Sequence, residues 1–328
     1  MKSDKTGLLS RRHILKSAAA FSCMPWLSGC SFAQKFVVAG HIWPGYEFIY
    51  MARDLDWLKT DDIELMFTHS ASESMQALRD QRAHAAMLTL DEAIRLCSEG
   101  LDLKIVLVFD ISLGADVVIS RPSIQHIEQL RAKRIGVEDS ALGALMFHQL
   151  LAQAHLQPQE VTKVTLTIDQ HLLAWQTHKI DAVITYEPNA GKLIKSGGFR
   201  LFDSRQIPDM IFDVLVVNKQ AINSHQSALR ELIRAHFKGL HHYRVNPMDA
   251  SYRVAKRLGL PAEEVLQVYR GLLLPDALAN YAYLSEQDQR VIEAANYLVA
   301  LMKQADIMVA HCDLRDLLTN QFIPKEYL

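Results

Sequence analysis

Two aromatic residues stand in a polar turn directly after an apolar run near the beginning of the chain. Trp43 and Tyr46 flank a Pro-Gly pair, and residues 36–40 form the apolar run that precedes them. Aromatic side chains at such a place either stack on a ligand or pack beneath the loop as core, and the sequence leaves both alternatives open. Trp43 and Tyr46 are therefore candidates for a ligand-binding surface.

Hydroxyl and glycine residues follow several other apolar runs. Ser70 and Ser72 come just before a helical stretch, where a serine can cap the helix and where free backbone N–H groups can bind an anionic group. Residues 110–116 and 139–143 again combine serine with glycine. This combination suits close approach of a ligand to the backbone, although turn geometry alone would also select it.

The motifs that mark common catalytic and metal sites do not occur in the chain. It contains no G-x-S-x-G, no H-E-x-x-H, no P-loop and no G-x-G-x-x-G after a strand. The 14 histidines are scattered along the sequence. We therefore expect no catalytic residue, no bound metal and no cofactor.

The first thirty residues have the order of elements of an export signal. Arg11 and Arg12 precede a short apolar stretch that ends in Leu-Ser-Gly-Cys at residues 27–30. The arginine pair resembles a twin-arginine signal, and the last four residues resemble a bacterial lipobox, whose cysteine is acylated. We predict a signal peptide over residues 1–29, of the twin-arginine or general secretory type, and a periplasmic lipoprotein anchored through Cys30.

Composition and charge restrict the class of protein. The 328 residues carry a formal net charge of −2, and 49 % of them are hydrophobic, as in ordinary globular proteins. The leader holds five basic residues and one acidic residue, so the rest of the chain is more acidic than the whole. No basic stripe remains for nucleic acid, and no apolar run after residue 35 is long enough to cross a bilayer. The lipid anchor is then the only expected membrane contact.

Two of the four cysteines, Cys97 and Cys312, belong to the body of the protein. Neither stands in a C-x-x-C pattern or beside a histidine cluster, so the sequence supports neither a zinc site nor a redox pair. Free cysteines usually behave as small buried hydrophobic residues, which we expect here, and a single bridge between the two stays open.

Apolar runs alternate with helical periodicity along most of the chain. The expected strands of a first set are residues 36–40, 63–67, 85–88, 104–109 and 116–120. A break at 121–123 separates them from a second set at 134–137, 164–167, 182–185, 199–202 and 213–217. This alternation predicts an α/β protein with helix-covered parallel sheets.

From about residue 221 the chain shows helical periodicity only. Two α/β units followed by a helical tail predict two lobes with a ligand cleft between them, at the carboxyl ends of the strands. We expect residues 36–119 and 218–328 to form lobe 1 and residues 120–217 to form lobe 2.

The residues Trp-Pro-Gly-Tyr-Glu at 43–47 and Tyr-Met-Ala-Arg-Asp-Leu at 50–55 resemble the solute-binding proteins of nitrate, sulfonate, taurine and thiamine-precursor importers. The likeness continues at residues 75–78, 110–116 and 185–188 and at Asn280. Those proteins have the type II periplasmic binding protein fold, and their superfamily also contains the yeast thiamine-pyrimidine synthase. The resemblance implies two lobes that close on a small solute and deliver it to the permease and ATPase subunits of an ABC importer.

The same resemblance, carried over position by position, implies a set of ligand-binding residues: Trp43, Tyr46, Ser70, Ser72, Thr89, Ser112, Gly114, Ser140, Leu142 and Glu187. The family's ligands suggest a small nitrogen- or sulfur-containing molecule.

The charge of the strand-end loops departs from part of the family. Relatives that bind nitrate or sulfonate need hydrogen-bond donors or positive charge, and the strand-end loops here contain no Lys or Arg. They contain the acids Glu47, Asp110, Asp116, Glu187 and Asp213. If these face the cleft, they favour a neutral or cationic nitrogenous ligand, with Trp43 as stacking surface and Glu187 as polar anchor on the opposite lobe.

Two further hypotheses follow from the same fold. A ligand-sensing protein would report occupancy to a membrane receptor, and the genes beside it would distinguish this role from transport. An enzyme like the thiamine-pyrimidine synthases would need a reactive cluster of histidine and cysteines, which this chain lacks. We therefore expect a binding protein and not an enzyme.

Overall fold

The computed structural model describes residues 34–59, 61–285 and 288–325. The expected signal peptide and Cys30 lie outside the described residues. Within these ranges, no helix combines the length and the apolar character needed to span a membrane.

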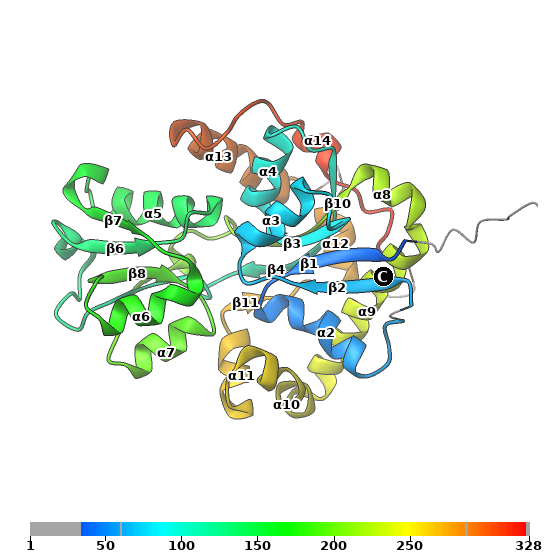
Figure 1. The fold of residues 1–328 in the computed structure, drawn as a ribbon, viewed down its shortest axis with the longest axis horizontal. Coiled ribbons are helices and arrows are strands. Elements are labelled where there is room, and N and C mark those ends of the chain that lie inside the picture. Colours follow the sequence, from blue (N-terminus) through cyan, green and yellow to red (C-terminus); the bar gives the residue numbers. More distant parts are fainter. Residues whose placement is uncertain (1–33, 60, 286–287, 326–328) are drawn as a thin grey trace, which may run out of the picture. The chain divides into compact units, whose positions relative to one another are not determined.

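Two mixed β-sheets, one in each lobe, organise the structure (Figure 1). The six-stranded sheet has the order β11-β4-β10-β3-β1-β2. Its strands are β1 (Phe36–Gly40), β2 (Ile63–Phe67), β3 (Ala85–Thr89), β4 (Leu103–Ser112), β10 (Phe212–Asn218) and β11 (Leu272–Leu273). The five-stranded sheet has the order β7-β6-β8-β5-β9. Its strands are β5 (Val117–Ser120), β6 (Arg134–Val137), β7 (Thr162–Thr165), β8 (Ala182–Thr185) and β9 (Phe199–Asp203).

Helices cover both faces of each sheet. Those of the first half are α2 (Glu47–Asp54), α3 (Ala71–Arg79), α4 (Leu90–Ser98), α5 (Ala141–Gln153), α6 (His171–Gln176) and α7 (Asn189–Lys195). Those of the second half are α8 (Lys219–Ser224), α9 (Gln226–Val245), α10 (Pro247–Leu258), α11 (Ala262–Tyr269), α12 (Ala277–Tyr283), α13 (Arg290–Gln304) and α14 (Leu314–Leu317). Figure 1 shows α5 on one face of the five-stranded sheet and α6 and α7 on the other.

The central strands are apolar because both faces of the sheet are covered. Every residue of β1 and of β3 is buried, whereas only Ile63 is buried in the edge strand β2, whose other residues are half-buried or exposed. This contrast follows from the position of a strand in a helix-covered sheet. The sequence predicted parallel sheets, but both sheets are mixed. The strands β10 and β11 run antiparallel to β4, and β5 runs antiparallel to β8 and β9.

The chain passes between the sheets earlier than the sequence suggested. Val117–Ser120 already pairs with β8 and β9, while Phe212–Asn218 lies between β3 and β4. The crossings are therefore residues 113–116 and 204–211, and not the positions near 120 and 217. The side chains of Ser112 and Ser204 hold the two crossings together, with their hydroxyl oxygens 2.8 Å apart.

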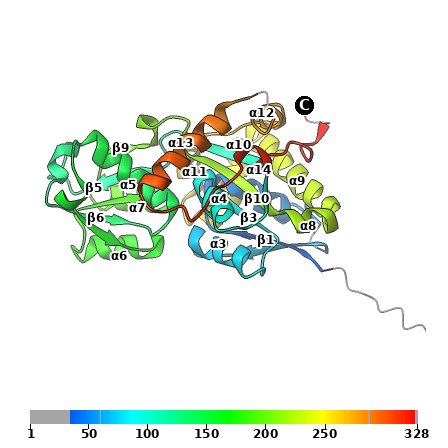
Figure 2. The same cartoon turned by 90° about the horizontal axis from the view of Figure 1, so that it is seen from above.

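The helical tail packs on the six-stranded sheet and also reaches the second lobe. Asn280 is fully buried in α12 and pairs with the backbone of β4, since its Oδ1 accepts from the N–H of Val108 at 2.7 Å. Figure 2 shows α13 running beside α4 toward α5, and there Gln149 Nε2 donates to the hydroxyl of Tyr297 at 2.6 Å. The tail is not helical throughout, because β11 adds a short strand at the edge of the sheet.

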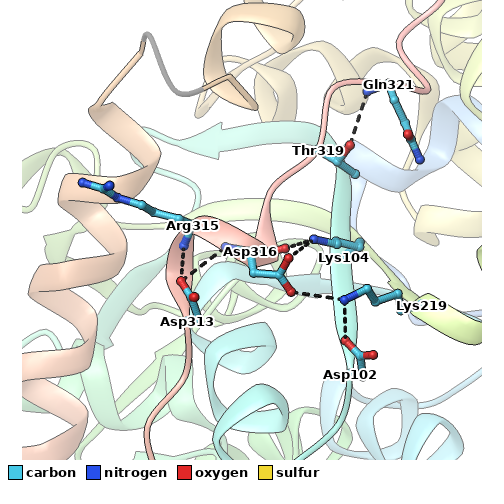
Figure 3. A network of polar contacts seen from close by, with 8 residues as sticks. All are labelled: Asp102, Lys104, Lys219, Asp313, Arg315, Asp316, Thr319 and Gln321. Carbon is cyan, nitrogen blue, oxygen red and sulfur yellow. Dashed lines mark hydrogen bonds and ion pairs between the residues drawn. The ribbon is translucent and has the colours of Figure 1, made fainter.

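Ion pairs on the surface fix the end of the tail to the start of β4 and α8 (Figure 3). Asp316 accepts from Lys104 at 2.7 Å and lies 3.4 Å from Lys219, which is 3.5 Å from Asp102. Asp313 caps α14 by accepting from the backbone N–H of Arg315 and of Asp316 (Figure 3). Exposed pairs of this kind contribute little each, so the network positions the segment more than it stabilises the fold.

A disulfide joins Cys97 in α4 to Cys312 before α14, across 215 residues of sequence. Of the two alternatives that the sequence left open, the single bridge is therefore the one found, and the less favoured of the two. The sequence separation could not reveal the pairing, because only the return of the tail over α4 brings the two residues together.

We expect the double variant Cys97→Ser/Cys312→Ser to melt at a lower temperature than the wild type. A bridge that closes so long a loop restricts the unfolded chain, and the chain-entropy model sets an upper limit of about 5 kcal/mol on its contribution. Differential scanning calorimetry measures the change, and the wild type with reductant present is the matched control. Equal melting temperatures for oxidised and reduced wild type would show that the bridge contributes nothing.

Candidate functional site

A small cavity lies where the strand ends of the two sheets face each other. We call it the inner cavity, and its free volume, the space open to the centre of a water molecule, is about 20 Å³. It is lined by His41, Trp43, Ala71, Thr89, Glu92, Asp116, Glu138, Ser140, Leu142, Tyr186 and Asp213. His41, Glu138 and Tyr186 directly follow β1, β6 and β8, and Thr89 is the last residue of β3. The cavity therefore lies at the position at which open α/β sheets bind ligands.

Trp43 is held at the cavity by a buried carboxylate. Its indole Nε1 donates to Asp110 Oδ2 at 3.0 Å. A Cβ at Gly45 would lie 1.7 Å from that carboxylate, so only glycine allows this approach of the turn to β4. Trp43 is thus a buried core residue that also lines the cavity, and its role as a stacking surface stays a prediction.

Tyr46 lies beneath the cavity and not on its surface. Its hydroxyl donates to Asp213 Oδ1 at 2.5 Å, and its ring packs edge-on against Phe109 with centroids 5.0 Å apart. Asp213 stands in register with Thr89 on one side and with Asp110 on the other, because β10 lies between β3 and β4. Tyr46 therefore orients a carboxylate that lines the cavity.

Five buried carboxyl groups surround this point, and no Lys or Arg is among the residues that line the cavity. Burial raises the pKa of Glu92 and of Asp110 to about 8 each. Burial likewise raises the pKa of Asp116 and of Glu138 to about 7. The pKa of Asp213 lies well above its usual range through burial, and the neighbouring Asp110 raises it further. Protons therefore offset part of the negative charge near neutral pH.

Polar atoms in the lining are left without partners. Asp116 Oδ2, Glu138 Oε1 and His41 Nδ1 are buried and have no hydrogen-bond partner in the described part of the chain. A buried polar atom of this kind costs free energy unless something bonds to it. Each of these atoms can bond a ligand that enters the cavity.

Aromatic rings enclose the carboxyl groups. Tyr186, after β8, meets Trp43 edge to face with ring centroids 5.4 Å apart, and it lies 6.4 Å from the ring of His41. Burial lowers the pKa of His41 to about 4, so its imidazole is neutral near pH 7. Burial raises the pKa of Tyr186 well above its usual range, and Glu138 and Glu92 are the charges that add most to this shift. Rings with π-faces beside carboxylates are suited to bind a cation.

The structure brings together four of the residues implied by the resemblance, Trp43, Thr89, Ser140 and Leu142. The other implied residues do not line the inner cavity. Some have structural roles near it, and Glu187 lines a different cavity. Ser70 caps α3, accepting from the N–H of Glu73 at 3.3 Å, and Ser72 lies in the first turn of that helix. Ser112 and the N–H of Gly114 both bond Ser204 at the crossings, at 2.8 and 2.6 Å.

Glu187 lines a different cavity, which also contains Gly114 and three arginines: Arg200, Arg205 and Arg270. Its Oε2 accepts from the N–H of Gly191 at 3.0 Å. Glu47, also named among the acidic candidates, does not line the inner cavity. It pairs instead with Arg257 at 2.8 Å.

The sequence reasoning missed His41, Glu92, Glu138 and Tyr186 as site residues. Three of them had a usable signal, since His41, Glu138 and Tyr186 directly follow β1, β6 and β8. Glu92 was hidden in a capping box, in which its Oε2 accepts from the N–H of Thr89 at 3.0 Å. In the described ranges, no group of three or more His, Cys, Asp or Glu side chains is arranged to hold a metal ion.

Comparison with known proteins agrees with this architecture. A family model described as NMT1/THI5 like matches residues 43–250. The aliphatic sulphonate-binding protein SsuA from Escherichia coli superposes with a TM-score of 0.70 at 15% identity, covering 89% of this chain and 99% of SsuA. A search of curated proteins finds no match.

Two other solved structures share the fold. The ligand-binding component of an ABC-type import system from Staphylococcus aureus, solved with zinc bound, has a TM-score of 0.71 at 14% identity, with 90% of this chain and 99% of that chain covered. The desulfurization enzyme DszB has a TM-score of 0.61 at 15% identity, with 88% and 98% covered. The fold therefore occurs in both binding proteins and an enzyme.

The buried carboxyl groups predict that the ligand-free protein loses stability as the pH rises from about 6.5 to about 8.5. Glu92, Asp116 and Glu138 have folded-state pKa values above the ordinary value near 4, so the folded state holds more protons in this window. The histidines with lowered pKa act in the opposite direction only below about pH 6.5. Each titrating group contributes at most about 1.4 kcal/mol per pH unit to the fall in unfolding free energy.

Urea unfolding at several pH values measures this slope. The variant Glu138→Gln should reduce it, whereas Asp249→Asn, on the surface of α10 with a lowered pKa, should leave it unchanged. An unfolding free energy that rises with pH across this window would contradict the assignment of buried, proton-holding carboxyl groups.

Proposed function

Because this chain belongs to the NMT1/THI5-like family, we propose that it is the extracytoplasmic solute-binding protein of an ABC importer. It captures a small nitrogen-containing solute with positive charge between its lobes and delivers it to the permease and ATPase subunits. The two-lobed fold, shared with importer components over nearly their whole length, supports this role.

The observation that carries the choice of ligand is the charge of the inner cavity. Four buried carboxyl groups line it, a fifth, that of Asp110, lies behind Trp43, and no Lys or Arg is among the lining residues. An ionised carboxylate is expensive to bury without a cation or a proton. A cationic ligand would satisfy this charge, and the rings of Trp43 and Tyr186 would add a cation–π contribution of about 0.5–2 kcal/mol each.

A sulfur-containing anion fits this cavity poorly. The sulphonate-binding relative shows that the fold can hold such ligands, but a sulfonate here would meet the carboxyl groups that remain ionised, with no Lys or Arg in the lining to offset the charge. Like charges placed opposite each other in a desolvated site oppose binding by several kcal/mol. The nitrogenous alternative is therefore the one that this chain's own residues favour.

Binding, and not catalysis, is the role that these side chains support. The fold also occurs in the desulfurization enzyme DszB, so the fold itself does not decide the question. In the described part of this chain both cysteines belong to the disulfide. The inner cavity therefore holds no thiol nucleophile, and its carboxyl groups have a clear use in holding a cation.

We expect Asp213→Asn to weaken binding of an organic cation by at least about thirtyfold. Loss of one partner from a desolvated charge pair costs about 2–5 kcal/mol, and asparagine keeps the size of the side chain. A thermal-shift screen of alkylammonium ions, cationic heterocycles and sulfonates identifies the ligand, and calorimetry then compares wild type with variant. Asp249→Asn, which removes a surface carboxylate far along the tail, is the matched control.

Two further variants define the extent of the site. Trp43→Ala should lower affinity by roughly fivefold or more through loss of the stacked ring. Glu187→Gln weakens binding only if the ligand also reaches the cavity with the three arginines. Tight binding of sulfonate or nitrate without binding of any cation would overturn the proposed ligand class and leave the family and the fold intact.

The proposed location at the membrane rests on Leu-Ser-Gly-Cys at residues 27–30. The variant Cys30→Ala should move the protein from the membrane fraction to the periplasmic extract, because acyl chains supply the membrane affinity. Fractionation followed by immunoblotting measures this shift, with Cys23→Ala as the control cysteine in the leader. Unchanged membrane association of Cys30→Ala would rule out this anchor.

A further inference from the structure

We propose that the ligand is an amphipathic organic cation whose charged nitrogen binds in the inner cavity and whose apolar part extends into a second cavity beside it. This inference rests on the proposed function and specifies the class of solute. We call the second space the outer cavity.

The size of the inner cavity allows only the head of such a molecule. Its free volume of about 20 Å³ is enough for one or two non-hydrogen atoms, since a single water needs about 10–15 Å³ by this measure. An ammonium nitrogen with its first methylene fills this space. Any larger solute must continue into an adjoining cavity when the lobes are in this arrangement.

The outer cavity adjoins the inner one through two shared rings, those of His41 and Tyr186. Its free volume is about 330 Å³. Residues of both lobes form it, with Ile42 and Phe67 on one side and Ile168 and Leu172 on the other. A chain that passes beside these two rings therefore enters a cavity in which Ile42, Phe67, Ile168 and Leu172 provide apolar surface.

Among the residues that line the outer cavity, Phe67 gives the strongest indication that an apolar group binds there. It is the last residue of β2, and the residue is 48 % exposed although it carries a large apolar surface. An apolar part of a ligand would remove this phenyl ring from water, which is favourable by about 25 cal/mol per Å² of apolar surface. The charged residues at the cavity, Asp169 and Lys192, have opposite signs, so the outer cavity does not demand a second charge.

Another cavity, between α5 and the end of α13, also touches the inner one but is the weaker candidate. It shares only Ser140 with the inner cavity, and charged side chains including Arg95, Asp139 and Lys163 line it. A polar connection and a charged lining suit water better than an alkyl or aryl group. Phe147 lines this cavity and provides a matched control for Phe67.

The test is calorimetry with a homologous series of cations: methylammonium, n-butylammonium, n-hexylammonium and 2-phenylethylammonium. In the wild type, affinity should rise about fourfold for each methylene that the outer cavity buries. Phe67→Ala and Leu172→Ala should flatten this rise and leave methylammonium binding unchanged. Phe147→Ala should leave the whole series unchanged, and melting curves of all variants confirm that they fold.

The outcomes separate this inference from the proposed function. Equal affinity for methylammonium and for the longer cations would overturn the outer cavity as part of the site and leave a cation-binding protein. A rise with chain length that only Phe147→Ala removes would also overturn it, since the tail would then lie in the other cavity. Binding of sulfonates and of no ammonium ion would overturn the proposed function together with this inference.

Discussion

The structure depends on carboxyl groups that are buried between two lobes without a basic partner. Two contacts hold them in place, from the indole of Trp43 to Asp110 at 3.0 Å and from the hydroxyl of Tyr46 to Asp213 at 2.5 Å. The insertion of β10 between β3 and β4 brings the two aspartates into neighbouring positions. The turn that carries the aromatic residues must then approach β4 so closely that Gly45 has no room for a side chain.

The same chain neutralises buried carboxylates elsewhere, which shows that the charge at the cavity is not a general feature of its packing. Glu47 is fully buried and pairs with Arg257 at 2.8 Å, and Asp203 pairs with Arg205 at 2.6 Å. Buried charges in proteins are normally compensated in this way. Uncompensated groups gathered in one cavity are a typical property of functional sites, where stability is lost to preserve binding chemistry.

The strands of both sheets could be predicted within a few residues, because each is a short apolar run between turn residues. Residues 36–40 and 63–67 agree with β1 and β2 at both ends. What the sequence could not supply was the pairing between distant segments. The antiparallel insertion of β10, the edge strand β11 and the disulfide of Cys97 with Cys312 all join residues far apart in the chain.

The residues of the site could be predicted only in part, for the same reason. Trp43 and Ser140 follow strands and were identified, whereas Glu92 was not, because it lies inside α4 and forms a capping box with Thr89.

The carboxyl groups of the inner cavity come from both lobes, and this gives the proposed function a physical link between binding and closure. Glu92 follows β3 in one lobe and Glu138 follows β6 in the other, and the charge of Glu138 contributes to the raised pKa of Glu92. Two ionised carboxylates that approach each other as the lobes close repel one another, so closure without a ligand requires protons on them. In the proposed function, a cation between them would replace repulsion by attraction and would therefore bind a closed arrangement better than an open one. A ligand shifts a conformational equilibrium only by such a difference in affinity, and here the difference arises from charges that the two sheets place on opposite sides of one small cavity.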